Sequence, residues 1–173
     1  MNSSFFSVTG IPGSGKTAFL TSLVQKSAQR GIEAGGFVQK RVVDQAGITI
    51  AYDLLRVRTG EQMRVATRNE HGGFAFDAEA FRAALDWVKQ DFKVAKLIVV
   101  DELGIIEIQG RGHAAVLPIL MEASPKPIVC FSLRKDKAGE WYCKLMIPMS
   151  QRLDLDADGC DRDEFSRSMI EKI

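Results

Sequence analysis

The chain has 173 residues, of which 46% are hydrophobic and 26% are charged. These values exclude disordered, collagen-like and coiled-coil proteins, and they predict a single domain over residues 1–173 that needs neither disulfides nor a structural metal to fold. The formal net charge of +1 does not indicate a dedicated nucleic-acid surface, so an anionic partner must be met at a local site.

The first elements are a strand, a loop and a helix in direct succession. Residues 5–9 form a short apolar strand, and a Gly/Pro/Ser loop at residues 10–15 separates it from an amphipathic helix over residues 16–29. Gly31 ends that helix. Short β-rich runs and helical patterns continue to alternate, which is typical of an α/β domain with a largely parallel sheet.

A β-hairpin is expected next. Residues 35–43 and 48–55 are rich in β-forming side chains, and the residues between them, 44–47, read Asp-Gln-Ala-Gly and favour a turn. A third short strand is expected over residues 63–67.

The strongest strand, residues 96–100, ends in a pair of acids. It is a continuous apolar run of the kind that is buried on both faces of a parallel sheet, and Asp101 and Glu102 follow it. An amphipathic helix precedes it, capped by Asp77 and ending near Asp91. The later elements are expected to be an acidic and apolar stretch over 103–109, a helix over 113–123, strands over 127–131, 141–147 and 152–155, and a last helix over 161–171.

The loop after the first strand carries a phosphate-binding pattern. Residues 10–17 fit G-x-x-x-x-G-K-[ST] at every fixed position, and they stand between a strand and a helix, as the pattern requires. Successive N–H groups at the helix N-terminus can surround a phosphate, while Lys16 reaches the β- and γ-phosphates and Thr17 ligates Mg²⁺. The residues expected to bind the nucleotide are Gly10, Ile11, Pro12, Gly13, Ser14, Gly15, Lys16, Thr17 and Ala18.

Asp101 and Glu102 are the second functional signal. Ligands of open α/β sheets bind beyond the carboxyl ends of the strands, so this strand brings both acids to the edge where the first loop lies. Asp101 is suited to holding Mg²⁺ through a bound water, and Glu102 is suited to deprotonating a water that attacks the γ-phosphate. The alternative is a pair of solvated or helix-capping acids.

Three segments carry a resemblance to a known family: GIPGSGKT, GGFVQKRVVDQAGITIAYDL and VVDELGIIEI. With them the chain resembles, over residues 5–170, the P-loop nucleoside triphosphatases related to human cancer-related nucleoside triphosphatase. The resemblance implies a three-layer, RecA-like α/β fold with a mostly parallel central sheet and a β-hairpin elaboration. It also implies slow, Mg²⁺-dependent hydrolysis of nucleoside triphosphates such as ATP and GTP with broad base tolerance, with Asp101 as the magnesium acid and Glu102 as the catalytic base.

The chain departs from the family pattern at one point. Members usually carry a lysine between the glycine and the second glutamate of the last segment, where this chain has Ile105 and Ile106. Arg111, Arg134 or Lys135 could supply the missing positive charge, and Arg134 is our catalytic candidate. For each of them the alternative is a solvated surface role.

Three further side chains allow two interpretations each. Glu107 lies between apolar residues, so it is expected either to hydrogen-bond a neighbouring loop or to support Glu102. Trp141 and Tyr142 either pack in or beside the core or stack on a nucleobase.

The function that we expect is hydrolysis of a nucleoside triphosphate to the diphosphate and phosphate, with Lys16 and Glu102 as catalytic residues. One alternative is a kinase-like phosphotransferase, whose basic lid would draw on Arg64, Arg68, Arg134 and Lys135. The other is a nucleotide-binding accessory protein with little turnover, because the chain also distantly resembles the P-loop accessory proteins of molybdenum-cofactor guanylation. A protein partner would then complete the site.

A cytoplasmic location is expected. Cys130, Cys143 and Cys160 are odd in number and far apart, which is typical of reduced thiols. The first residues lack the basic segment of a signal peptide, and no apolar run approaches the roughly 20 residues of a membrane-spanning helix, so no membrane partner is expected.

Overall fold

The computed structural model describes residues 4–122 and 127–173. Its strands are β1 (Phe5–Gly10), β2 (Ala34–Val43), β3 (Thr49–Arg56), β4 (Gln62–Arg68), β5 (Phe74–Phe76), β6 (Leu97–Leu103), β7 (Ile128–Arg134) and β8 (Arg152–Asp154). Its α-helices are α1 (Lys16–Gln29), α2 (Ala78–Asp91), α3 (Ile105–Ile108), α4 (Val116–Glu122), α5 (Ala138–Leu145) and α6 (Arg162–Ile170). Short 3-10 helices are η1 (Gly112–Ala115), η2 (Lys135–Lys137) and η3 (Met149–Gln151).

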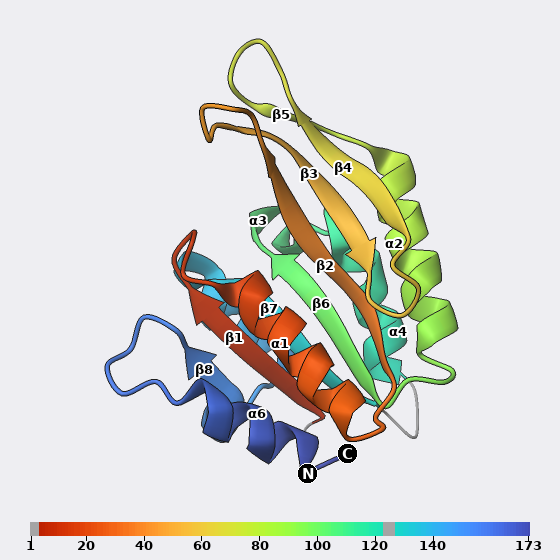
Figure 1. Ribbon diagram of the computed structural model, residues 1–173, viewed down its shortest axis with the longest axis vertical. Helices are drawn as coiled ribbons and strands as arrows, with labels where there is room; N and C mark the ends of the chain where they lie inside the picture. Colours follow the sequence, from red (N-terminus) through yellow and green to blue (C-terminus); the bar gives the residue numbers. More distant parts are fainter. Residues whose placement is uncertain (1–3, 123–126) are drawn as a thin grey trace.

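The strands form one eight-stranded sheet in the order β5-β4-β3-β2-β6-β7-β1-β8 (Figure 1). The five strands from β2 to β8 in this order pair in parallel, whereas β3, β4 and β5 extend the sheet beyond β2 in antiparallel pairs. This arrangement confirms the expected α/β class, the mostly parallel centre and the hairpin. The short strand β5 was not expected, because three residues carry too little periodicity to be read.

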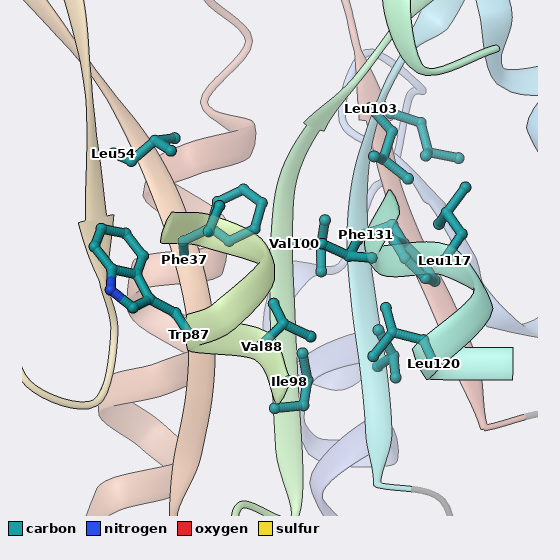
Figure 2. Packing of buried hydrophobic residues seen from close by; sticks show 14 of the residues in the cluster. Phe37, Leu54, Trp87, Val88, Ile98, Val100, Leu103, Leu117, Leu120 and Phe131 are labelled. Atoms are coloured by element: carbon teal, nitrogen blue, oxygen red, sulfur yellow. The ribbon is translucent and has the colours of Figure 1, made fainter. Parts of the chain in front are cut away.

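Helices cover both faces of the sheet, so the molecule has three layers. The central strand β6 shows why: Leu97 and Val99 pack on the α1 and α6 side, and Ile98 and Val100 pack on the α2, α4 and α5 side. Alternate side chains of a strand point to opposite faces, so a run that is apolar at every position requires cover on both. Figure 2 shows the second of these cores, with Trp87 and Val88 of α2 against the strands.

Two segments of the second half of the chain differ from the expected elements. Residues 141–145 of the expected strand over 141–147 are helical and belong to α5, which ends at Leu145. Ala138, Trp141 and Leu145 lie on its buried face, so the apolar spacing is three and four residues, which is the period of a helix. The expected helix over 113–123 is η1 followed by α4, with Pro118 in the first turn, where proline is tolerated; residue 123 lies outside the described residues.

A buried ion pair joins α2 to the hairpin. The Asp91 carboxylate, fully buried, accepts a hydrogen bond from the Gly36 N–H at 3.0 Å and lies 2.5 Å from an Arg56 nitrogen. Gly36 has a φ of +87°, and a β-carbon there would lie 2.0 Å from the Val99 carbonyl oxygen. The close approach of β2 to β6 therefore requires glycine at this position.

Removing the Asp91 carboxylate should destabilise the fold strongly. Asp91→Ala leaves the Gly36 N–H without its acceptor and the buried Arg56 guanidinium without its only buried carboxylate, since among the described residues Arg56 keeps just the Gln90 amide oxygen and the more exposed Glu61; breaking a buried pair in this way costs about 3–5 kcal/mol. The exposed Asp86, which lies 3.6 Å from Lys89 on the same helix, is the matched control, and Asp86→Ala should cost no more than about 1 kcal/mol. Urea unfolding measures both, and equal losses would contradict the role given to Asp91.

Within the described residues, no helix combines the length and the apolar character needed to cross a membrane.

Candidate active site

The carboxyl ends of the parallel strands bring the predicted residues to one edge of the sheet. The loop at residues 10–15 leaves β1 and leads into α1, and Asp101 and Glu102 lie at the end of β6. Strand β7 separates β1 from β6 in the sheet, and β2 flanks β6 on the other side. The second half of β2 therefore runs past the acids, and its side chains border the site.

The loop has the backbone that the phosphate-binding pattern predicts. Gly15, directly before α1, has a φ of +94°, a conformation that side chains other than glycine rarely adopt. The Lys16 side chain is buried, and its ammonium donates to the Gly10 and Ile11 carbonyl oxygens, at 3.0 Å each. The loop thus holds a positive charge next to the N–H groups at the start of α1.

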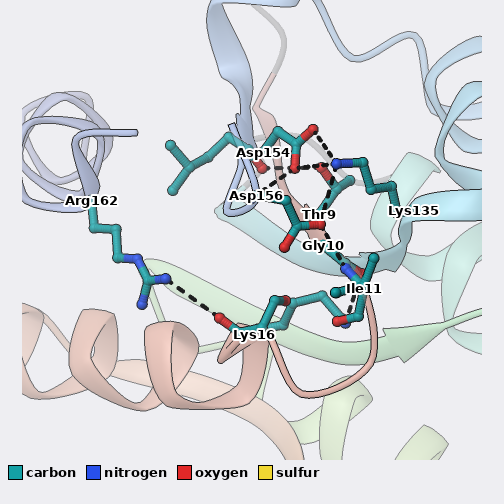
Figure 3. A network of polar contacts seen from close by, with 10 residues as sticks. Thr9, Gly10, Ile11, Lys16, Lys135, Asp154, Asp156 and Arg162 are labelled. Atoms are coloured by element: carbon teal, nitrogen blue, oxygen red, sulfur yellow. Dashed lines mark hydrogen bonds and ion pairs between the residues drawn. The ribbon is translucent and has the colours of Figure 1, made fainter. Parts of the chain in front are cut away.

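Residues from distant parts of the chain brace the outside of the loop (Figure 3). An Asp156 carboxylate oxygen accepts from the Ile11 N–H at 2.9 Å, and Lys135 bridges Asp154 and Asp156 at 3.1 and 3.2 Å. The Ile11 N–H and Lys135 hold the pKa of Asp156 below its ordinary value. Arg162 of α6 donates to the Ser14 carbonyl oxygen at 3.4 Å. Lys135, a candidate catalytic cation from the sequence, is therefore engaged in supporting the loop.

Asp101 is fully buried behind Thr17. The Thr17 hydroxyl donates to one carboxylate oxygen at 2.7 Å, and the Gln39 N–H donates to the same oxygen at 3.0 Å. The Ser132 hydroxyl donates to the other oxygen. Burial raises the pKa of Asp101 above its ordinary value, although the three donors and the charge of Lys16 oppose the shift. A carboxylate so tightly bound has a fixed orientation, with Thr17 between it and the loop.

Glu102 has an unusual backbone. Its φ is +66°, and the pairing of β6 with β7 shifts register between Val100 and Leu103, so the two acids lie in a β-bulge. The Glu102 N–H donates to the Ser132 hydroxyl at 2.8 Å, which fixes this conformation. Bulges and positive φ angles outside glycine are enriched at functional sites, because they redirect a side chain. Here the bulge sends Asp101 into the core and leaves Glu102 partly accessible.

The electrostatic surroundings of Glu102 are mixed. Burial and the neighbouring Asp101 raise the pKa of Glu102 above its ordinary value, while Lys16 and Arg134 oppose the shift. A glutamate with a raised pKa is a better proton acceptor when ionised, which is the property that a general base needs.

A cavity of about 520 Å³ lies over the loop and reaches Glu102. Its walls are Pro12, Gly13, Gly15, Lys16, Thr17, Gln39, Lys40, Arg41, Tyr52 and Glu102. Four of these residues come from strands β2 and β3, namely residues 39–41 and 52, and the sequence reasoning missed them. The adjacent cations Lys40 and Arg41 in a predicted hairpin were the available signal, but their position depends on the pairing of β2 with β6. Five of the expected nucleotide-binding residues line this cavity. The other four, Gly10, Ile11, Ser14 and Ala18, are their neighbours in the sequence and do not line it.

A model of a family described as NTPase matches residues 5–147. The chain belongs to this NTPase family. Two relatives are the nucleoside-triphosphatase THEP1 of Methanocaldococcus jannaschii, 29% identical over 78% of this chain and 84% of that protein, and THEP1 of Pyrococcus abyssi, 25% identical over 75% and 74%.

Two solved structures share the fold of this NTPase family member. The solution structure of a human cancer-related nucleoside triphosphatase superposes with a TM-score of 0.71 and 16% identity, covering 97% of this chain and 96% of that one. The crystal structure of THEP1 from Aquifex aeolicus superposes with a TM-score of 0.65 and 19% identity, covering 97% and 95%. These likenesses confirm the fold that the sequence resemblance implied.

The candidate catalytic arginine of this NTPase family member lies on the far side of Glu102 from the loop. Arg134, at the end of β7, is paired with Asp136 at 3.1 Å and borders a second cavity, which Ile105 and Ile106 also line. Arg111 lines neither of the two cavities. The segment in which the family usually has a lysine is therefore apolar here and faces a different space from the loop.

The remaining interpretations are resolved by contacts. Glu107 accepts from the Gly104 N–H at 2.9 Å and from the His113 N–H at 3.2 Å, which is the loop-bracing arrangement rather than a contact with Glu102. Trp141 is fully buried in the core, and Tyr142 stacks against the Arg152 guanidinium at 3.9 Å. Neither aromatic ring lines the two cavities.

Proposed function

We propose that this protein is a Mg²⁺-dependent nucleoside triphosphatase that releases the diphosphate and phosphate slowly and with broad base specificity. The observation that carries the proposal is the shared cavity: the phosphate-binding loop with Lys16 forms one wall, and Glu102 forms another. A triphosphate on the loop would present its terminal phosphate to a partly buried carboxylate, which is the arrangement required for attack by water.

Each residue then has a distinct role. The N–H groups of residues 13–17 and the Lys16 ammonium bind the phosphate oxygens and stabilise the charge that develops on them. Glu102 accepts the proton of the attacking water. Arg134 supplies positive charge on the other side of Glu102, where it favours the ionised carboxylate. Broad base specificity follows because the loop contacts the phosphate chain, which all nucleoside triphosphates share.

The residues present fit a magnesium ion that is bound together with the nucleotide. Thr17 and Asp101 offer hard oxygen donors, and their 2.7 Å hydrogen bond brings those donors together at the base of the loop. Within residues 4–122 and 127–173, no group of three or more His, Cys, Asp or Glu side chains could hold a metal alone. Mg²⁺ is commonly bound by one or two protein oxygens together with substrate phosphates and water, where it neutralises phosphate charge.

Metal dependence and base tolerance can be measured together. Phosphate release from ATP, GTP, CTP and UTP should proceed with Mg²⁺ and fall to background when the metal is chelated. The rates should agree within roughly tenfold, since a site built to read the base would discriminate by about 10⁴-fold or more. Release that persists with a chelator would contradict the metal role, and a single accepted nucleotide would contradict broad specificity.

Phosphotransfer finds less support than hydrolysis. Three of the four basic residues that a lid would need are ion-paired, Arg64 with Asp53, Arg134 with Asp136, and Lys135 with Asp154 and Asp156, and Arg68 donates to the Thr49 carbonyl oxygen at 3.4 Å. A separate proposal concerns location. We propose that the protein is cytoplasmic, because Cys130, Cys143 and Cys160 are free thiols and thiols stay reduced in the cytoplasm.

A further inference from the structure

A second cavity of about 330 Å³ adjoins the nucleotide cavity. Gln39, Tyr52 and Glu102 form the wall between the two, because each of them lines both. This volume is at the lower end of the range of about 300–1,000 Å³ that is usual for small-molecule sites. The cavity lies beyond Glu102 as seen from the phosphate-binding loop, and no role in triphosphate hydrolysis accounts for it.

The lining of this second cavity is mainly aromatic and aliphatic. Tyr52 and Phe74 lie with ring centroids 5.1 Å apart, and Phe76 and Phe81 lie 6.0 Å apart. Phe76 keeps 53% of its surface exposed and Ile105 keeps 39%, which is high for large apolar side chains beside a cavity. Rings arranged in this way favour a planar aromatic ligand, since stacked or edge-on aromatic pairs gain energy beyond the area that they bury.

His113 adds a polar ring that has no hydrogen-bond partner among residues 4–122 and 127–173. Only 3% of its surface is exposed, and both ring nitrogens are buried without a hydrogen bond. Its ring packs against Phe37 and Phe81, at 4.5 and 4.8 Å between centroids, and its backbone N–H donates to the Glu107 carboxylate, so the imidazole is held at the cavity wall. Leaving buried polar atoms unpaired is costly, so the site is suited to a ligand that supplies the partners.

The chemistry of the wall selects the class of ligand. Burial lowers the pKa of His113 to about 3, so at neutral pH its ring has one N–H donor and one nitrogen acceptor. A planar nitrogen heterocycle carries acceptors and donors, so it can pair with either of these groups. At the other end, the Gln39 amide is suited to hydroxyl groups. Nucleosides combine a planar nitrogen heterocycle with several hydroxyl groups.

We propose that this cavity binds a nucleoside as a second ligand, with the base against His113 and the aromatic residues and the sugar toward Gln39. The separation of the two ligands rests on the proposed function: with its terminal phosphate at Glu102, the bound triphosphate has its own base directed away from this cavity. Nucleoside and nucleoside triphosphate should therefore bind together.

The test measures the binding of adenosine, guanosine, cytidine and uridine to the protein saturated with a non-hydrolysable ATP analogue. At least one nucleoside should bind, with its affinity reduced about tenfold by His113→Phe, which removes the hydrogen bond between the imidazole and the base. Ile105→Trp, a change at a partly exposed position that fills the cavity, should abolish binding. His71→Phe, which replaces the exposed histidine between β4 and β5, is the matched control and should bind normally.

Four results would overturn the proposal: no nucleoside binds, the ATP analogue displaces the nucleoside, neither variant weakens binding, or benzyl alcohol binds as tightly as the nucleosides. Displacement by the ATP analogue would mean that the base of the triphosphate itself occupies the cavity. Equal binding of benzyl alcohol would mean that the cavity does not recognise ring nitrogens. Nucleoside binding without phosphate release would refute the proposed hydrolysis alone, and release without binding would refute the second site alone.

Discussion

Replacing Glu102 by Gln should lower the rate of phosphate release by about 10²- to 10⁴-fold, the usual contribution of a general base, and leave nucleotide binding intact. The glutamine keeps the size and the backbone of the bulge but cannot accept the proton of the attacking water. Glu140→Gln on α5 is the matched control, because that carboxylate is exposed and pairs with Lys137 at 2.8 Å. An unchanged rate in Glu102→Gln would contradict the assignment of the base.

The dependence of the rate on pH provides a second signature of Glu102. The carboxylate is active only when ionised, and burial together with Asp101 raises its pKa above the ordinary value of 4.5. As the pH falls through this raised pKa, the residue takes up a proton and the rate should decline; as the pH rises through it, the rate should recover. This acidic limb, measured with the nucleotide saturating, should lie above the ordinary glutamate pKa and be absent from the residual rate of Glu102→Gln.

The sequence predicts the centre of the fold well because its signals there are local. The strand, glycine loop and helix over residues 5–29 are contiguous, and one apolar run predicts that both faces of β6 are buried. The end of β6 was predicted less accurately. It continues through Asp101 and Glu102 to Leu103, because Ser132 on the neighbouring strand holds the bulge, and a single segment does not reveal that contact.

The wall of the site opposite the loop depends on contacts between distant segments. Gln39 and Tyr52 reach Glu102 only because β2 pairs with β6 in parallel and β3 folds back on β2. The same applies to His113, whose burial depends on packing against Phe37 and Phe81 from other elements. Asp156 braces Ile11 across 145 positions in the chain. No spacing rule connects such residues, so only the folded chain shows them together.

Replacing Lys16 by Ala should weaken nucleotide affinity by roughly 30- to 4,000-fold, which corresponds to the loss of about 2–5 kcal/mol for one partner of a buried charge pair. The Lys16 ammonium is buried against the Gly10 and Ile11 carbonyl oxygens, so it is already held at the phosphate-binding loop before a ligand arrives. Lys26→Ala is the matched control on the same helix, because Lys26 is paired with Asp163 at 2.5 Å, away from the loop.

The charge of Lys16 also acts on the two acids, since it lowers the pKa of both Asp101 and Glu102. Lys16→Met keeps an unbranched side chain of similar length and removes only the charge, so it should lose as much affinity as Lys16→Ala. In both variants the pKa of Glu102 should rise further, and the acidic limb of any residual activity should move to higher pH. Equilibrium binding of a non-hydrolysable triphosphate measures the loss of affinity. Normal affinity in Lys16→Met would show that packing, rather than charge, makes this lysine necessary.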